Sequence, residues 1–324
     1  MQPPSSKLVR TVLAGRYQLD ALHARGGSSE IYRAFDTRES RVIAVKIPHA
    51  SRIDSPERKQ SFLDEARLLQ QLEHPSIVRV LDVVDDAEAP FIVTEWLRGV
   101  TLADALATVR QFDALDAATL LTPAVAALAF THERGFVHRD FKPANVFLCV
   151  HSDGTVDARL LDFGIARAIH DTARGATDRT FVATGSPTYM APERVRFESH
   201  GDARADVWSV GVTMFELVAG RAPFEEPTLA KLFARIGQDE PPTLESMVPG
   251  VDRGYAMIVR RCLRRSADAR YQTAAELLLD LRRMLEAHPP RVFLLPTQSS
   301  GVQDKLTPAA LDAMHSIADE DFEF

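Results

Sequence analysis

At 324 residues, the chain is longer than a single hydrophobic core usually supports, which predicts a body of two lobes with extensions. Hydrophobic residues make up 45% of it, and no run approaches the roughly 18 consecutive apolar residues of a membrane span. The net charge of −7 argues against a dedicated nucleic-acid binder, because a phosphate backbone selects basic surfaces. We therefore expect a soluble protein with no nucleic-acid partner and no membrane segment.

The N-terminal segment Met1–Arg10 lacks the apolar core of a signal peptide. The two cysteines, Cys149 and Cys262, are far apart in the chain and have no metal-ligand spacing. Structural disulfides are therefore not expected, and the composition fits a protein of the reducing cytoplasm.

Three short β-strands are predicted near the N-terminus, because β-branched and aromatic residues stand between turn signals there. They cover Tyr17–Leu22, Ser29–Phe35 and Val42–Ile47. The glycine-containing stretch Ala24–Ile31 joins the first two strands, and by itself it is compatible with any hairpin turn.

A helix should follow the third strand. Ser55 is its expected N-cap, and Pro56 lies in its first turn. Three apolar residues at helical spacing mark its buried face: Phe62, Ala66 and Leu69. Glu65 lies on the same stripe, and an unpaired buried charge costs several kcal/mol, so this carboxylate needs a partner. Lys46, near the end of the third strand, is the natural candidate.

Further along the chain the composition becomes more helical. Phe91–Leu97 is predicted as a buried strand that runs into a connector, and Thr101–Asp104 resembles a capping box. Ala117–Arg134 has helical composition and ends at a glycine. Pro123 falls inside this helix and should kink it or mark a late start.

A β-hairpin is expected beyond this helix. Its strands are Val146–Val150 and Arg159–Leu161, and its turn is Ser152–Thr155. The second strand leads directly into Asp162.

The most informative stretch of the chain is His138–Asn145, which is followed by Asp162–Gly164. Asp140 can orient a substrate hydroxyl and accept its proton, and Lys142 can neutralise charge on a transferred phosphate. Asn145 and Asp162 can hold Mg²⁺ on ATP phosphates. The types and order of these residues predict phosphoryl transfer.

On these motifs the chain resembles the protein kinase family, specifically its bacterial eukaryotic-like (Hanks-type) serine/threonine branch. The resemblance covers about Arg16 to Leu285. It implies an α+β, bilobal protein-kinase-like fold, with a small β-rich N-lobe that carries one key helix and a larger, mainly helical C-lobe. It also implies a serine/threonine protein kinase that uses ATP with Mg²⁺ or Mn²⁺ and acts on protein substrates bearing Ser or Thr.

The implied domain boundaries are an N-terminal extension at 1–15, the N-lobe at 16–97, the C-lobe at 98–288 and a C-terminal tail at 289–324. The tail contains one short predicted helix, with Thr307 as its cap and Pro308 as its first residue. This tail could dock on the body, bind a partner or stay unstructured, and the sequence does not choose among these.

The resemblance implies an ATP site in the N-lobe. The glycine-rich loop would cover the phosphates, and Lys46 would bind the α- and β-phosphates and pair with Glu65. The backbone of the connector would bind adenine, with Thr94 behind it. The implied ATP-binding residues are Ala24, Arg25, Gly26, Gly27, Ser28, Ser29, Ala44, Lys46, Glu95, Trp96, Leu97 and Asp162. Ala24 and Ser29 stand where the family pattern has its outer two glycines, and alanine at the first of these positions is the clearer departure.

In the C-lobe, the resemblance implies catalytic, metal-binding and regulatory residues. The implied catalytic residues are Asp140, Lys142, Asn145, Lys46 and Glu65, and the implied metal ligands are Asn145 and Asp162. Asp162–Glu193 corresponds to the activation segment, in which Thr177, Thr180 and Thr184 are candidate phosphorylation sites. A phosphate on one of them would recruit Arg139. Autophosphorylation in trans would require transient self-association.

Further residues are implied as supports of the catalytic loop and activation segment. Ser186 would bridge Asp140 and Lys142 through its hydroxyl. Glu193 would pair with Arg270, and Asp206 would hold the catalytic-loop backbone.

Two alternative functions remain open. The first is a pseudokinase scaffold, which only Ala24 motivates. The second is a small-molecule phosphotransferase on a kinase-like fold, against which stand Lys142 and the Ala191–Glu193 stretch, since both are typical of enzymes with peptide substrates.

Overall fold

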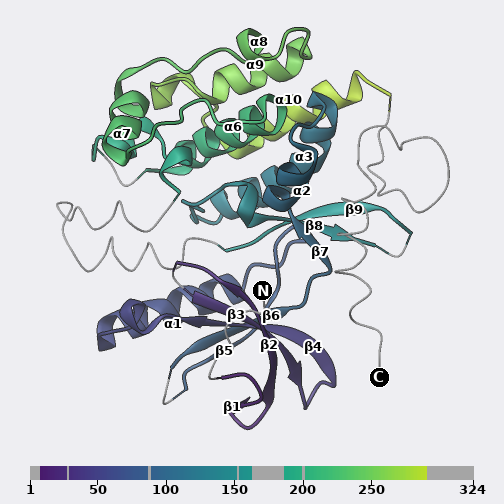
Figure 1. Ribbon diagram of the computed structural model, residues 1–324, viewed down its shortest axis with the longest axis vertical. Coiled ribbons are helices and arrows are strands. Elements are labelled where there is room, and N and C mark those ends of the chain that lie inside the picture. The colour runs from purple at the N-terminus through teal and green to yellow at the C-terminus, as the bar shows by residue number, and fades with distance from the viewer. Residues whose placement is uncertain are drawn as a thin grey trace. The chain divides into compact units, whose positions relative to one another are not determined.

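The computed structural model describes residues 8–27, 29–86, 89–151, 153–162, 186–198 and 201–289. Within them the chain forms two compact units, whose elements are labelled in Figure 1. The first unit, here the N-lobe, comprises described residues up to 74 and those of 78–97. The second, here the C-lobe, comprises 75–77 and the described residues from 98 onward. A strand-rich N-lobe with one long helix and a mainly helical C-lobe confirm the predicted α+β class.

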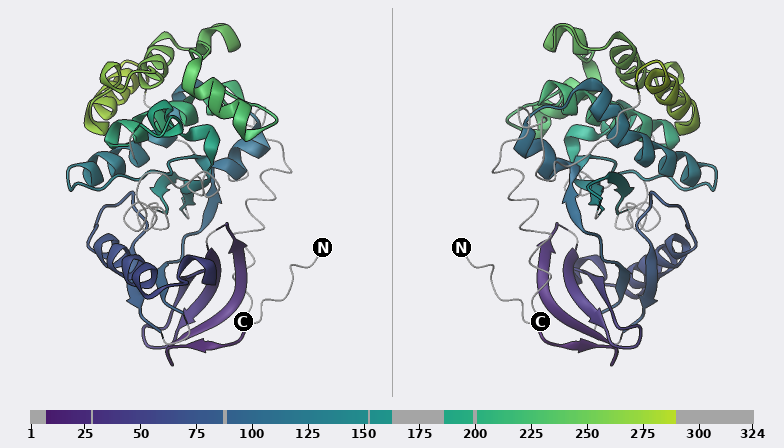
Figure 2. Two further views of the ribbon diagram at one scale, coloured as in Figure 1. Left: turned by 90° about the vertical axis from the view of Figure 1, so that its left-hand side faces the viewer. Right: turned by 90° about the vertical axis from the view of Figure 1, so that its right-hand side faces the viewer.

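The N-lobe is built on a six-stranded antiparallel sheet with the order β1-β2-β3-β4-β6-β5. Figure 1 labels its strands, and Figure 2 shows the sheet from two further sides. Its strands are β1 (Val12–Leu13), β2 (Tyr17–Arg25), β3 (Ser29–Asp36), β4 (Arg41–Pro48), β5 (Val80–Val84) and β6 (Phe91–Glu95). Strands β1 and β5 were not predicted from the sequence, and β1 lies in the segment predicted as an N-terminal extension. The prediction also ended β2 too early, because Ala24 and Arg25 continue the pairing with β3.

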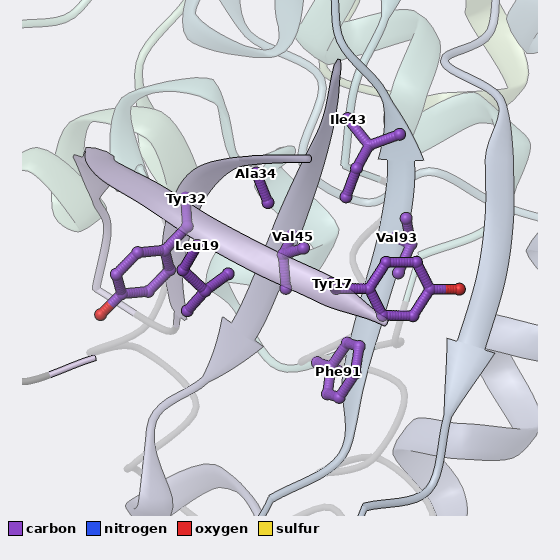
Figure 3. Close-up of a cluster of buried hydrophobic side chains, with 8 residues drawn as sticks. All are labelled: Tyr17, Leu19, Tyr32, Ala34, Ile43, Val45, Phe91 and Val93. Atoms are coloured by element: carbon purple, nitrogen blue, oxygen red, sulfur yellow. The ribbon is translucent and has the colours of Figure 1, made fainter. Parts of the chain in front are cut away.

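One face of this sheet carries the core of the N-lobe, which Figure 3 shows in close-up. Its fully buried side chains come from four strands: Tyr17, Leu19, Tyr32, Ala34, Ile43, Val45, Phe91 and Val93. Tyr17 and Phe91 pack edge to face, with ring centroids 5.8 Å apart. Alternation along the strands therefore directs the intervening residues of β4 and β6 to the opposite face.

The helix of the N-lobe is α1 (Pro56–Gln70), and it packs against β5. It begins as predicted, since the Ser55 hydroxyl accepts a hydrogen bond from the backbone N–H of Arg58 at 3.3 Å. The predicted apolar stripe of Phe62, Ala66 and Leu69 is buried.

The C-lobe contains a three-stranded sheet, β7 (Gly99–Thr101), β8 (Val146–Val150) and β9 (Val156–Leu160). The predicted hairpin is present, but β9 starts earlier than expected. The reason is a tight turn, in which Asp153 Oδ1 accepts hydrogen bonds from the backbone N–H of Thr155 at 2.9 Å and from its hydroxyl at 2.6 Å.

The helices described in the C-lobe are α2 (Leu102–Val109), α3 (Ala114–His132), α5 (Pro192–Val195), α6 (Ala203–Ala219), α7 (Leu229–Gln238), α8 (Leu244–Met247), α9 (Arg253–Cys262) and α10 (Ala274–Glu286). The capping box predicted at Thr101–Asp104 opens α2 with both of its hydrogen bonds. The central helix α6 is buried along most of its length and ends at Gly220, whose φ of 73° is the left-handed conformation that favours glycine.

Helix α3 differs from its prediction at its start. Asp113 caps it by accepting a hydrogen bond from the backbone N–H of Leu115, so the helix begins at Ala114. Pro123 lies well inside it, which rules out the late start. By length and composition, α3 is the one helix among the described residues that could cross a membrane, which the sequence analysis did not anticipate. However, 67% of its apolar window is buried, and it packs on α10, α6 and β9 as a core helix does.

Candidate functional site

The predicted catalytic loop connects α3 to β8 in the C-lobe. Helix α3 ends before Gly135, whose φ of 80° turns the chain. His138 and Phe141 are fully buried, so they anchor the loop in the core while the residues between them stay half-buried. The short 3₁₀ turn Pro143–Asn145 then leads into β8.

A buried carboxylate on α6 holds the start of this loop. Asp206 Oδ2 accepts a hydrogen bond from the backbone N–H of His138, and Oδ1 accepts one from that of Arg139, both at 2.7 Å. His132 Nε2 lies 2.9 Å from Asp206 Oδ2. Burial raises the pKa of Asp206, but the His132 contact and the nearby histidines lower it more, so its carboxyl stays ionised. The backbone at the start of the loop is thus hydrogen-bonded to a fixed negative charge. Holding this backbone is the role predicted for Asp206.

Three predicted site residues are brought together at the surface of the loop. Lys142 Nζ lies 2.8 Å from Asp140 Oδ2, with both side chains about one-fifth exposed. Asn145 Nδ2 donates to the backbone carbonyl of Asp140 at 2.8 Å and to its Oδ2 at 3.2 Å. Lys142 and Asn145 therefore orient the carboxylate of Asp140, whose side chain stays partly exposed.

Leu161, the residue before Asp162, positions Asp162 next to the catalytic-loop residues. The backbone N–H of Leu161 donates to the carbonyl of Asn145 at 2.8 Å, and the Leu161 carbonyl accepts from His138 Nε2 at 2.9 Å. Asp162 itself has a φ of 42°, an uncommon conformation for a residue other than glycine.

The side chains of Asn145 and Asp162 are suitable ligands for a hard divalent cation, because both offer oxygen atoms. Since Asn145 Nδ2 is used by Asp140, its Oδ1 is the atom left for a metal. Across the described residues no cluster of three or more His, Cys, Asp or Glu could hold a metal alone. The pair would therefore need further ligands, such as phosphate oxygens.

The end of the predicted activation segment is anchored on the C-lobe. The Tyr189 hydroxyl donates to Glu216 Oε2 at 2.6 Å, and Ser209 Oγ donates to the Tyr189 carbonyl at 2.8 Å. Arg270, whose side chain is fully buried, forms the pair predicted for it, with Nη1 and Nη2 at 2.9 and 2.7 Å from the Glu193 carboxylate. Ser186 is half-buried at the start of the 3₁₀ turn Pro187–Tyr189, and its predicted bridge to the catalytic loop stays a prediction.

In the N-lobe, three residues predicted to line the nucleotide site, Ala44, Lys46 and Thr94, share the sheet face opposite the core. In the register of the sheet, Ala44 of β4 lies opposite Thr94 of β6, and Lys46 of β4 lies opposite Ile31 of β3. Because Ala44 and Lys46 are two residues apart, they point to the same face as Thr94. The buried residues between them, such as Val45, point to the core.

The glycine-rich loop is shorter than predicted. With Ala24 and Arg25 in β2 and Ser29 in β3, only residues 26–28 lie between the strands. The backbone N–H of Gly26 donates to the Ser29 carbonyl at 2.9 Å, and Arg25 pairs with Glu30 at 2.8 Å.

The predicted connector begins at the last residue of β6. Glu95 Oε1 accepts a hydrogen bond from the backbone N–H of Arg79 at 2.8 Å. The ring of Trp96 packs edge to face on His23, with centroids 4.9 Å apart, and Leu97 follows half-buried.

Some predicted residues lie outside what the structure describes. They are Ser28, the side chain of Glu65, and the stretch 163–185 with Thr177, Thr180 and Thr184. The Lys46–Glu65 pair, the Arg139–phosphate contact and the tail helix at Thr307 and Pro308 remain predictions for the same reason.

Two residues that hold the loop, His132 and Arg194, were not predicted from the sequence. Arg194 Nη1 donates to the backbone carbonyl of Arg139 at 3.0 Å. Neither residue belongs to a motif on which the chain resembles the family, and each contact joins positions at least 55 residues apart, so no local pattern reveals it.

A model of the protein kinase domain family matches residues 17–280 of the chain. Among curated proteins, the chain is 34% identical over 281 residues to a probable serine/threonine-protein kinase PknB of Corynebacterium glutamicum, covering 84% of this chain and 43% of that protein. It is 35% identical over 283 residues to the serine/threonine-protein kinase PknB of Mycobacterium tuberculosis, covering 86% and 44%. The chain thus spans less than half the length of these two relatives.

Two solved structures share its fold. A double mutant of the Mycobacterium tuberculosis PknI kinase domain superposes with a TM-score of 0.69 at 22% identity, covering 87% of this chain and 100% of that one. Rad53 residues 1–466, in complex with AMP-PNP, superposes with a TM-score of 0.67 at 24% identity, covering 81% and 64%. At these identities the similarity shows the fold alone.

Proposed function

The chain belongs to the protein kinase family, and we propose that it transfers the γ-phosphate of ATP to serine or threonine hydroxyls of protein substrates. The observation that carries this proposal is the grouping of Asp140, Lys142 and Asn145, in which a lysine and a carboxamide orient one accessible carboxylate. Family members perform phosphoryl transfer with residues of these types.

In this proposal, Asp140 accepts a hydrogen bond from the substrate hydroxyl and orients it. The hydroxyl oxygen forms a bond to the γ-phosphorus while the bond from phosphorus to the bridging oxygen breaks, and that electron pair leaves with ADP. The hydroxyl proton passes to the Asp140 carboxylate. Lys142 remains beside the reacting oxygens and neutralises part of their charge.

Asn145 and Asp162 would hold the metal, with Mg²⁺ as the expected ion and Mn²⁺ as the alternative. Such a cation supplies charge neutralisation on the phosphate oxygens. Lys46 and the glycine-rich loop would bind the phosphates from the N-lobe, while the backbone of Glu95–Leu97 would bind adenine.

Regulation would act through the activation segment. Phosphate on Thr177, Thr180 or Thr184 would attract the guanidinium of Arg139, and phosphorylation in trans would need transient pairing of two copies. We propose that the protein is cytoplasmic, consistent with Cys149 and Cys262, which are buried and form no disulfide among the described residues.

The test is transfer from labelled ATP to the chain itself and to a mixture of Ser- and Thr-containing peptides, with Mg²⁺ present. Asp140→Asn should lose transfer by at least about a thousandfold, because it removes the acceptor of the hydroxyl proton. The matched control is Asp153→Asn, an aspartate of the exposed hairpin turn, which should keep full turnover.

Full turnover by Asp140→Asn would exclude the mechanism. No transfer by the wild type, together with a thermal shift on adding ATP, would favour the pseudokinase scaffold. Transfer to small hydroxyl compounds but not to peptides would favour the small-molecule phosphotransferase.

A further inference from the structure

The residue before the proposed catalytic carboxylate has an unfavourable backbone conformation. Arg139 has a φ of 65°, in the left-handed region, which is unfavourable for a residue with a side chain. Such a conformation persists only where surrounding groups impose it. The direction in which Asp140 leaves the backbone depends on this one residue.

Both peptide groups that flank Arg139 are held by other parts of the C-lobe. On its N-terminal side, the Arg139 N–H donates to Asp206 Oδ1 at 2.7 Å. On its C-terminal side, the Arg139 carbonyl accepts from Arg194 Nη1 at 3.0 Å, and the N–H of Asp140 donates to His138 Nδ1 at 3.3 Å. The peptide plane that carries Asp140 is therefore fixed at both its oxygen and its nitrogen.

Arg194 reaches this carbonyl from the end of the activation segment. It lies on α5, directly after Glu193, whose carboxylate is paired with buried Arg270. The Arg194 residue is only 4% exposed, so its guanidinium donates in a largely dry environment where a charge-assisted hydrogen bond is strong.

The path of the Arg194 side chain depends on a glycine at the start of α6. A Cβ on Gly201 would lie 2.7 Å from Cδ of Arg194 and 2.9 Å from Cβ of Ala205, both closer than real contacts allow. Gly201 also has a φ of 79°, and any L-residue there is strained. The side chain of Arg194 thus occupies space that a side chain at position 201 would fill.

We propose that Arg194 is a positioning residue, which clamps the carbonyl of Arg139 and so sets the orientation of Asp140 for phosphoryl transfer. Through it, the anchored end of the activation segment is mechanically joined to the catalytic loop. The catalytic half of this inference rests on the proposed kinase function, while the structural half does not.

The first test compares Arg194→Met with Arg196→Met by steady-state kinetics and thermal unfolding. Methionine keeps much of the apolar stem but removes the donors, so Arg194→Met should lower kcat about 10- to 100-fold, with KM for ATP and peptide changed by less than about threefold. Arg196, two residues on, donates to the carbonyl of Gly237 and not to the loop, and its variant should keep kcat within about twofold. Arg194→Lys should restore part of the loss, because it keeps a donor.

A second pair of variants covers the case in which Arg194→Met does not fold. Gly201→Ala and Gly250→Ala introduce the same backbone strain, since their φ values are 79° and 81°, but a Cβ on Gly250 would meet no atom within 4 Å. Only Gly201→Ala should therefore lower kcat, by roughly 3- to 10-fold, by displacing the arginine. Equal kcat in the two glycine variants, or wild-type kcat in folded Arg194→Met, would overturn the inference.

Amide hydrogen exchange separates this inference from the proposed function. Arg194→Met should speed exchange of the Asp140 and Arg139 amides while leaving those of α6 unchanged. If the wild type transfers no phosphate, the proposed function fails but the clamp can still be tested. Unchanged exchange of the Arg139 and Asp140 amides in Arg194→Met would refute the clamp.

Discussion

The catalytic loop at residues 138–145 and the glycine-rich loop at residues 26–28 are both expected to handle phosphate, yet they are held by different means. Side chains from α5 and α6, together with His138 of the loop itself, hold successive backbone groups of the catalytic loop. In the glycine-rich loop, the contact closing the described part is the hydrogen bond from Gly26 N–H to the Ser29 carbonyl.

Glycines close to the core of the C-lobe and glycines of the glycine-rich loop differ in the same way. A Cβ on Gly27 would meet nothing within 4 Å, and one on Gly26 would make an ordinary contact of 3.5 Å. On Gly211 of α6, by contrast, it would lie 2.5 Å from Cβ of Cys262. Packing therefore demands glycine at position 211, whereas in the loop of the N-lobe the demand would come from a ligand that approaches the backbone.

The largest effect on stability should come from removing the support beneath the activation segment. Glu193→Ala leaves Arg270 as an uncompensated buried charge and should cost about 3–5 kcal/mol of unfolding free energy. Chemical denaturation measures this. The control is Glu198→Ala, whose exposed carboxylate pairs only with Arg196 among the described residues, and a loss below about 1 kcal/mol at position 193 would show that the pair supports little.

The next largest effect should be on turnover. Asp206→Asn offers one acceptor oxygen where the carboxylate accepts from three donors, and its NH₂ would face a backbone N–H. We expect kcat to fall about 100-fold in a folded protein, measured beside the control Asp202→Asn. Asp202 caps the same helix, and asparagine caps equally well, so this control should be neutral. Near wild-type turnover of Asp206→Asn would mean that the loop holds its shape without tertiary support.

A smaller effect should appear as a pH dependence that arises in the catalytic loop. Burial lowers the pKa of His138, which is fully buried there. As pH falls through about 6.5, the unfolded state gains a proton that this folded histidine resists, so stability decreases on acidification. The loss between pH 7.5 and 6 should be at most roughly 0.8 kcal/mol, the limit for one histidine that stays neutral in the folded state.

This dependence is measured as denaturation free energy against pH. His138→Gln should flatten the slope, and His151→Gln, at an exposed site, should not. The range stays above pH 6 because the raised pKa values of Asp20 and Glu216, both due to burial, act in the opposite direction at lower pH. An unchanged slope in His138→Gln would contradict the prediction.

The smallest effect on stability should come from the glycine-rich loop. Gly27→Ala should change unfolding free energy by less than about 0.5 kcal/mol, because its Cβ meets no neighbour. If a nucleotide approaches this backbone, KM for ATP should nevertheless rise severalfold. Gly211→Ala, in contrast, should be clearly destabilising. An unchanged KM for Gly27→Ala would separate the loop from nucleotide binding.

Structural features that depend on residues a few positions apart could be predicted from the sequence. The Ser55 cap, the Thr101–Asp104 capping box and the β-branched and aromatic runs of β3 and β4 all concern residues within a few positions, and the structure has them where they were predicted. The order of motifs likewise indicated the family, because phosphoryl transfer needs certain residue types at certain spacings.

Boundaries were predicted less well where side chains compete with the pattern. The Asp153 turn moved the start of β9, the cap at Asp113 extended α3, and pairing with β3 carried β2 through Ala24. Strands β1 and β7 were missed because two and three residues give no clear period. Strand β5 was missed because all five of its residues are half-buried, so no alternation marks it.

By itself, the sequence determined the family and predicted several of the elements and the residues proposed to carry the chemistry, because these depend on residue type and local spacing. Only the tertiary structure decided what holds them in place. The clamp of Arg194 on Arg139 and the contact of His132 with Asp206 join positions 55 and 74 residues apart. Such contacts exist only once packing has excluded water and brought distant backbone together, so no local pattern encodes them.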